Sequence, residues 1–152
     1  MATFGKAMGN GYPIGCVVGK REIMEKVKDV WIAATFNGHF VSAAAALATI
    51  EEMEKHDGIQ TIWRQGEKLQ KGLGEIMKAH GVDARPVGLG PMPHLAFGPG
   101  NEELRDRFYT EAAANGVYFS PGHVWFISLS HDDKAIQQTL DASEKAIKKA
   151  LR

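Results

Sequence analysis

The sequence predicts an α+β protein with a small antiparallel or mixed sheet that carries its helices on one face. Two observations support this fold class. Long segments repeat apolar residues with a 3.6-residue period, and short apolar segments lie between glycine and proline turns. Their order from residue 42 onward is helix, helix, strand, strand, helix, strand, strand, helix. That order is typical of a small sheet packed against helices.

The composition is that of a globular protein. The chain has 152 residues, of which 44% are hydrophobic and 24% are charged, enough to bury one core. Eighteen basic residues balance eighteen acidic ones, which gives no electrostatic reason to expect nucleic acid or an anionic membrane as a partner. The apolar stretches are too short to span a membrane. The single cysteine, Cys16, excludes an internal disulfide and suggests a cytoplasmic location.

The first forty residues are rich in glycine, aromatic and β-branched residues. Within them, Ile14 to Val18 predicts a short buried strand and Arg21 to Val27 a short helix. A longer helix follows, with Ser42 as its N-terminal cap, an ion pair between Glu51 and Lys55, and Asp57-Gly58 at its end.

The next helix is expected from Ile59 to about His80, ending at Gly81. Three glycines lie inside it: Gly66, Gly72 and Gly74. Each costs roughly 1 kcal/mol of helix stability relative to alanine. We therefore expect them to mark places where the helix packs closely against a neighbouring element.

The remaining elements alternate strands and helices. A helix capped by Asn101 ends at Asn115-Gly116, and the last helix begins near Ser130 with Asp133 at capping-box spacing. This last helix is expected to bury Ile136, Leu140, Ser143, Ile147 and Leu151. Four short strands are expected, at Arg85 to Gly88, His94 to Gly98, Val117 to Phe119 and Trp125 to Leu129.

The most informative motif for function is the run Phe4-Gly5-Lys6-Ala7-Met8-Gly9-Asn10-Gly11-Tyr12-Pro13-Ile14-Gly15. Its glycines allow sharp turns and close approach of the backbone to another molecule. A lysine in such a loop can act as an amine nucleophile towards a carbonyl group, or be an ordinary exposed lysine. A nucleotide-binding loop is excluded, because Ala7 follows Lys6 where a hydroxyl residue is required. The dinucleotide fingerprint fails because Tyr12-Pro13, and no helix, follows Gly9-Asn10-Gly11.

The run around Lys6 resembles the cofactor-lysine segment of the class III pyridoxal-phosphate-dependent aminotransferases. Thr35-Phe36-Asn37-Gly38 is similar to the threonine-glycine segment of that family. Two later runs resemble tail segments of its glutamate-1-semialdehyde aminomutase-like branch: Gly116-Val117-Tyr118-Phe119-Ser120-Pro121 and Phe126-Ile127-Ser128-Leu129-Ser130-His131. The segments occur in the family's order and span essentially the whole chain.

The resemblance implies the C-terminal part of a fold-type I pyridoxal-phosphate transferase. Residues 1–41 would belong to its large cofactor-binding domain and residues 42–152 to its small C-terminal domain. Lys6 would form a Schiff base with pyridoxal 5'-phosphate. Thr35, with Gly38, would reach the cofactor phosphate held by the partner subunit of a homo-oligomer. From the residues alone, the Thr35 hydroxyl could equally satisfy local backbone groups.

His123 and Trp125 would line the substrate mouth by the same resemblance, although a turn histidine beside a core tryptophan explains them as well. The six histidines have no ligand spacing, so no metal site is expected. The sequence departs from the family at His39-Phe40-Val41, where asparagine-proline is common, and no arginine lies between Arg107 and Arg152 to bind a substrate carboxylate.

The implied function is transfer of an amino group from an amine or amino-acid substrate through Lys6. Whether the reaction is that of an aminotransferase or an aminomutase stays open. In the family, the aspartate that pairs with the cofactor pyridine, the phosphate loop and the stacking aromatic residue precede the lysine. The isolated 152-residue chain is therefore expected to be inactive, and a separate large-domain chain is a candidate partner. The alternative is a non-catalytic remnant or partner-binding module of that family.

Overall fold

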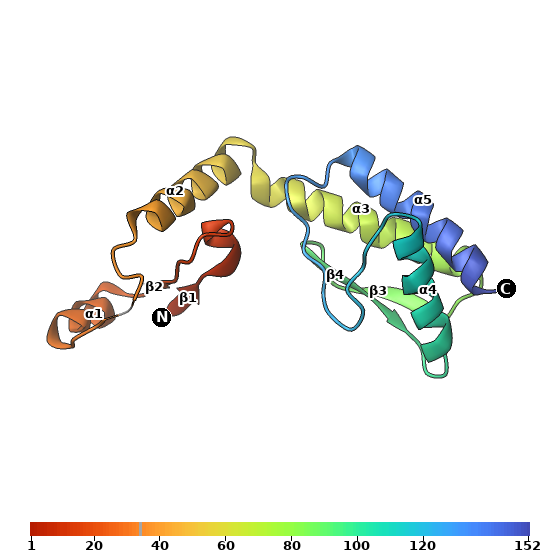
Figure 1. Ribbon diagram of the computed structural model, residues 1–152, viewed down its shortest axis with the longest axis horizontal. Coiled ribbons are helices and arrows are strands. Elements are labelled where there is room, and N and C mark those ends of the chain that lie inside the picture. The colour runs from red at the N-terminus through yellow and green to blue at the C-terminus, as the bar shows by residue number, and fades with distance from the viewer. Residues whose placement is uncertain (34) are drawn as a thin grey trace. The chain divides into compact units, whose positions relative to one another are not determined.

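The chain forms two compact units, residues 1–57 and residues 58–152, in the computed structural model, which describes residues 1–33 and 35–152 (Figure 1). Each unit has its own secondary structure and is described separately. The predicted assignment of residues 1–41 and 42–152 to two domains of a larger enzyme concerns that enzyme, and it stays a prediction. None of the helices in the described part of the chain is long and apolar enough to cross a membrane.

The first unit begins with a two-stranded antiparallel ribbon. Strand β1 (Ala2–Phe4) pairs with β2 (Cys16–Val18), and the 3-10 helix η1 (Lys6–Gly9) lies in the connection between them. The strand expected at Ile14 to Val18 is therefore present but shorter, and the expectation that it is buried is wrong. Val17 and Val18 are exposed because a two-stranded ribbon has little surface with which to cover its own side chains.

Three helical segments complete this unit: α1 (Arg21–Met24), η2 (Glu25–Asp29) and α2 (Phe40–Lys55). Helix α2 begins two residues before Ser42, so the expectation that Ser42 caps it is wrong. The Ser42 hydroxyl is buried and lies 2.7 Å from Nδ1 of His39. Lys55 pairs with Glu52 at 3.1 Å, whereas Glu51 had been expected as its partner.

The second unit is built on α3 (Gly58–Ala79), which is continuous through its three glycines. A Cβ on Gly66 would overlap the backbone carbonyl of Gly90, and one on Gly72 would lie 2.6 Å from Cδ1 of Leu140. The expected close packing is thus confirmed at two of the three glycines. Gly81 follows the helix with a φ of +65°, as expected of a residue that ends it.

The sheet of this unit is an antiparallel hairpin of β3 (Ala84–Leu89) and β4 (Met92–Phe97), which packs against α3. The strands expected at Val117 to Phe119 and at Trp125 to Leu129 are absent. The second segment nevertheless follows β4, because the backbone N–H groups of Trp125 and Ile127 donate to the carbonyls of Pro93 and Pro91 at 2.8 and 3.0 Å. Two bonds to the end of a hairpin are too few to make a regular third strand.

Two further helices, α4 (Glu102–Ala114) and α5 (Asp133–Ala150), pack against each other. Asn101 occupies the cap position of α4, but its side chain donates to the carbonyl of Gly98 and does not cap the helix. Helix α5 starts after the predicted Ser130. Its cap is Asp132, which accepts a hydrogen bond from the N–H of Ala135 at 2.8 Å.

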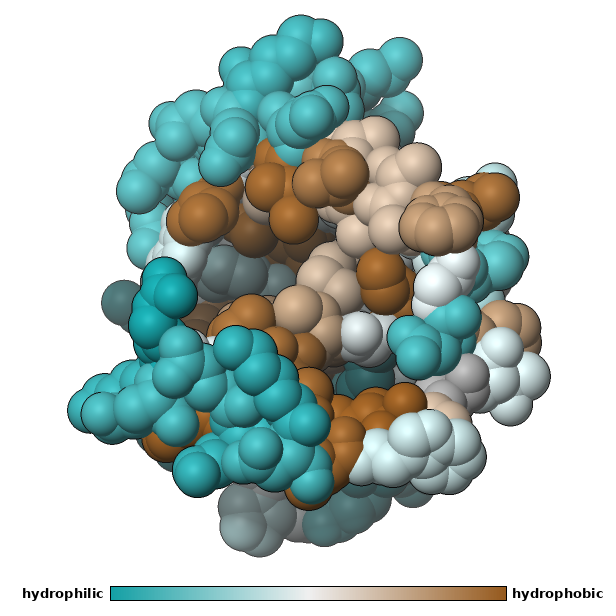
Figure 2. All heavy atoms as spheres, turned by 90° about the vertical axis from the view of Figure 1, so that its left-hand side faces the viewer, coloured by the Kyte–Doolittle hydropathy of each residue, from teal (hydrophilic) through white to brown (hydrophobic). Residues whose placement is uncertain are grey.

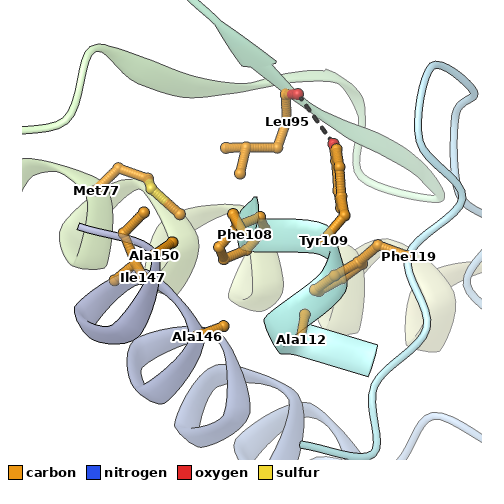
Figure 3. Packing of buried hydrophobic residues seen from close by; sticks show 9 residues of the cluster. All are labelled: Met77, Leu95, Phe108, Tyr109, Ala112, Phe119, Ala146, Ile147 and Ala150. Carbon is orange, nitrogen blue, oxygen red and sulfur yellow. Dashed lines mark hydrogen bonds between the residues drawn. The ribbon is translucent and has the colours of Figure 1, made fainter. Parts of the chain in front are cut away.

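The core of the second unit lies between α3, α4, α5 and the hairpin (Figure 3). Ile136, Ser143 and Ile147 are fully buried as expected, and Leu140 is half-buried. The expectation for Leu151 is wrong because this residue lies past the end of α5 and is 47% exposed. The predicted α+β class, with small antiparallel sheets and packed helices, is confirmed.

Candidate functional site

Lys6 is the first residue of η1, and its side chain is exposed. Its backbone has a φ of +52°, in the left-handed region that side-chain-bearing residues seldom occupy. Three hydrogen bonds hold the turn: the N–H groups of Met8, Asn10 and Tyr12 donate to the carbonyls of Gly5, Ala7 and Gly9 at 3.2, 3.1 and 3.0 Å. An ordered backbone therefore presents the amine to its surroundings.

Thr35 and Gly38 lie in the turn that leads into α2. The N–H of His39 donates to the carbonyl of Phe36 at 3.1 Å, and Gly38 has a φ of +79° with open space where a side chain would be. The turn borders a hollow of about 720 Å³ in the first unit. Among the residues that line it are Pro13, Ile14, Thr35, Gly38, His39 and Ser42.

The hollow suits an anionic group. The first N–H groups of α2 have no partner within the helix, and they carry the positive end of its dipole. The Thr35 hydroxyl can donate a further hydrogen bond. None of the described lining residues is acidic. A phosphate group is the kind of anion that such a helix start binds.

The predicted residues of the first unit do not all meet at one place. Thr35 and Gly38 share the hollow, whereas Lys6 is not among its lining residues. Lys6 is instead on η1, which packs against α2.

His123 and Trp125 lie in the second unit and have different environments. His123 is exposed, and its Nδ1 lies 2.7 Å from the carbonyl oxygen of Val124. Trp125 packs on Phe119, with 4.3 Å between ring centroids, and its indole N–H donates to the carbonyl of Ser120 at 3.1 Å. Trp125 thus has a packing role in the core. Of the two residues, only His123 has an exposed polar group, the Nε2 side of its ring.

The positions of Ile14, His39 and Ser42 along the hollow were not predicted from the sequence. The i,i+3 spacing of His39 and Ser42 at a helix start is a signal of their contact. No local pattern identifies Ile14, because its place in the hollow depends on the fold of η1 onto α2. Within the described residues, no cluster of three or more histidine, cysteine, aspartate or glutamate side chains could hold a metal ion.

Comparison with known proteins shows the family. Residues 1–148 match the family described as Aminotransferase class-III. The chain is 36% identical to the glutamate-1-semialdehyde 2,1-aminomutase of Methanothrix thermoacetophila over 97% of its own length and 38% of that protein. It is 30% identical to the 3-aminobutyryl-CoA aminotransferase of Cloacimonas acidaminovorans over 97% of its length and 37% of that protein.

Solved structures agree with the sequence comparison. The FumI protein of Sphingopyxis sp. MTA144, in its PLP internal aldimine form, superimposes with a TM-score of 0.90 at 27% identity, over 99% of this chain and 36% of that one. Family members thus bind pyridoxal 5'-phosphate. The chain spans a little over a third of the length of the relatives that it matches. It belongs to the class III aminotransferase family.

Proposed function

We propose that this chain is part of a pyridoxal-phosphate-dependent aminotransferase or aminomutase in which Lys6 is the reactive amine. The family match over residues 1–148 is the observation that supports this proposal. Residues 1–41 would complete the large domain of that enzyme, and residues 42–152 would form its small domain. The substrate would be an amine or an amino acid.

Lys6 would have two tasks. Its primary amine would hold the cofactor covalently, because among side chains only a primary amine forms a carbon–nitrogen double bond with an aldehyde, the aldehyde oxygen leaving as water. Once a substrate amine has displaced it, the Lys6 Nζ would remove the proton from the substrate α-carbon and return it to a second carbon. Pyridoxal 5'-phosphate, when bound, supplies the aldehyde and the electron sink for this chemistry.

Thr35 and Gly38 would hold the cofactor phosphate. The described residues fit this group: the hollow combines the Thr35 hydroxyl, the open backbone at Gly38 and the start of α2. In a homo-oligomer, Thr35 of one subunit would serve the cofactor bound to Lys6 of the other. His123 would border the substrate, with Trp125 fixing the loop that carries it.

The isolated chain would be inactive. Lys6 is exposed, so water would compete with its condensation and with every later proton transfer. A large-domain chain, fused or separate, would enclose the amine. The alternative, a non-catalytic remnant or partner-binding module, is favoured by the same exposure of Lys6.

Borohydride trapping tests the proposal. The chain would be incubated with pyridoxal 5'-phosphate and borohydride, alone and joined behind the preceding portion of the Methanothrix thermoacetophila relative. Peptide mapping of the joined protein should place the label on Lys6, with loss of the label in Lys6→Ala and a weaker cofactor affinity in Thr35→Ala. Lys20→Ala, a change at another exposed lysine of the first unit, is the matched control and should keep full labelling. Labelling spread over many lysines of the joined protein would favour the non-catalytic alternative.

A further inference from the structure

The turn that carries Lys6 approaches Ile14 closely at both of its ends. Gly9 is the buried residue of η1, and a Cβ placed on it would lie 2.7 Å from Cγ2 of Ile14. At the other end of the turn, a Cβ on Gly5 would lie 3.4 Å from the carbonyl oxygen of Ile14. The glycines on both sides of Lys6 therefore pack against the same residue.

The side chain of Ile14 is rigid enough to hold the turn around Gly9 in place. Because its β-branched side chain is restricted at χ1, Cγ2 cannot move away from a new neighbour without a cost in free energy. Ile14 also lines the hollow that contains Thr35 and Gly38. One side chain thus borders both the lysine turn and the hollow.

The turn that carries Lys6 also has a neighbour in α2. The buried residues of α2 are the small Ser42 and Ala46, and η1 packs against this helix. A turn displaced by a new contact between position 9 and Ile14 would carry the left-handed backbone of Lys6 with it.

We propose that Ile14 is a positioning residue for Lys6: seated on Gly9, its side chain fixes the turn and so the direction from which the amine is presented. This inference rests on the proposed role of Lys6. It predicts that a methyl group on Gly9 pushes Ile14 toward the hollow and moves Lys6 out of reach of the cofactor aldehyde. A misplacement of about 1 Å at a reacting group can reduce its reaction by orders of magnitude.

The first measurement needs no cofactor. Hydrogen–deuterium exchange of the Met8, Asn10 and Tyr12 amides would be followed in the chain and its variants, because these amides hold the turn. Gly9→Ala should speed their exchange about tenfold. Gly15→Ala is the matched control, since its Cβ would approach only the carbonyl oxygen of Phe4, at 3.9 Å, and exchange should not change.

The second measurement is the yield of borohydride-trapped Lys6 in the joined protein. Gly9→Ala should lower it about tenfold. The Gly9→Ala/Ile14→Ala double variant, in which the methyl group added at position 9 occupies the vacated space, should return to within about twofold of the parent. If Gly9→Ala does not fold, Ile14→Ala alone should lower the yield.

Each outcome decides the inference. If Gly9→Ala speeds amide exchange but leaves the yield of trapped Lys6 unchanged, the contact with Ile14 is only structural. If neither exchange nor yield changes, the contact does not hold the turn. Both results overturn the inference. If the unsubstituted joined protein itself fails to label Lys6, the proposed function is overturned together with this inference. If it labels Lys6 and only the variants depart from expectation, the inference alone is overturned.

Discussion

At the scale of single residues, burial strongly affects the ionisation of Tyr109. Its ring packs in the core beside those of Phe108 and Phe119, and its hydroxyl donates to the carbonyl of Leu95 at 3.5 Å (Figure 3). Burial raises the pKa of Tyr109 to about 12 from an ordinary 10.0, because a phenolate in this site would lose its hydration. The burial of Tyr109 was not predicted from the sequence.

The raised pKa predicts how stability depends on alkaline pH. Below about pH 10 the tyrosine is neutral in both states, so its contribution is constant. Between about pH 10 and 12 the unfolded state loses the proton first, and the free energy of unfolding should fall. Urea unfolding as a function of pH should show this fall in the parent but a smaller one in Tyr109→Phe. Tyr118→Phe, at an exposed position, should leave the fall unchanged.

At the scale of elements, helices were better predicted than strands. The period of α3 was strong enough to fix its extent despite its glycines, since Leu69, Leu73 and Met77 recur on its buried face. The strands expected after Gly116 failed because an apolar run specifies burial without specifying a backbone partner. Trp125 and Ile127 are half-buried as such a run suggests, but they meet only the end of the hairpin.

Only part of the candidate site was accessible from the sequence. A motif predicts roles for Lys6 and Thr35 because their residue types and local glycines carry the signal, and those roles stay predictions. It cannot identify Ile14, whose contacts join segments that are close only in the folded chain. The start of α5 was placed too early, near Ser130, because serine and aspartate are both good helix caps in sequence. The structure distinguishes the candidates, since Asp132 caps the helix and Asp133 binds Lys68 at 2.9 Å.

The contact between α3 and the hairpin predicts opposite effects for two glycine substitutions in one helix. Gly66→Ala should destabilise the protein by about 1–3 kcal/mol, because the new methyl group would overlap the backbone of Gly90. Gly74→Ala is the matched change, since its methyl would lie 3.5 Å from Pro86 in ordinary contact, and it should stabilise by roughly 0.5–1 kcal/mol. Chemical denaturation would compare the two, and equal effects would contradict the close packing.

At the scale of the whole molecule, the first unit exposes more apolar surface than a free protein usually does. Figure 2 shows hydrophobic residues gathered between hydrophilic ones on the face turned to the viewer. The exposed residues of the first unit include Phe4, Tyr12, Val30, Trp31, Ile32 and Phe36. Surfaces of this kind are normally covered by a partner. Burial of this surface by self-association was expected and stays a prediction.

Self-association can be tested together with the proposal that Thr35 of one subunit serves the cofactor bound to Lys6 of the other. Sedimentation of the joined protein should show a homo-oligomer at micromolar concentration. Mixing inactive Lys6→Ala with the weakened Thr35→Ala variant should raise amino transfer above that of Thr35→Ala alone at low cofactor concentration, because each mixed dimer holds one site with both residues intact. A Lys6→Ala and Lys6→Met mixture is the control and should stay inactive. Absence of this increase, with mixed dimers demonstrated, would place Thr35 in the same site as its own Lys6.

The distribution of tryptophans has a practical optical consequence. Trp31 is 91% exposed in the first unit, while Trp63 and the half-buried Trp125 belong to the second. Trp31 emission should be shifted to long wavelength and quenched readily by iodide, whereas the emission of Trp125 is shielded by Phe119. Because Trp63 is also exposed, at 37%, the Trp63→Phe variant would let intrinsic fluorescence report the two units separately. A partner that covers the first unit would become visible as a blue shift and as loss of quenching, without any added dye.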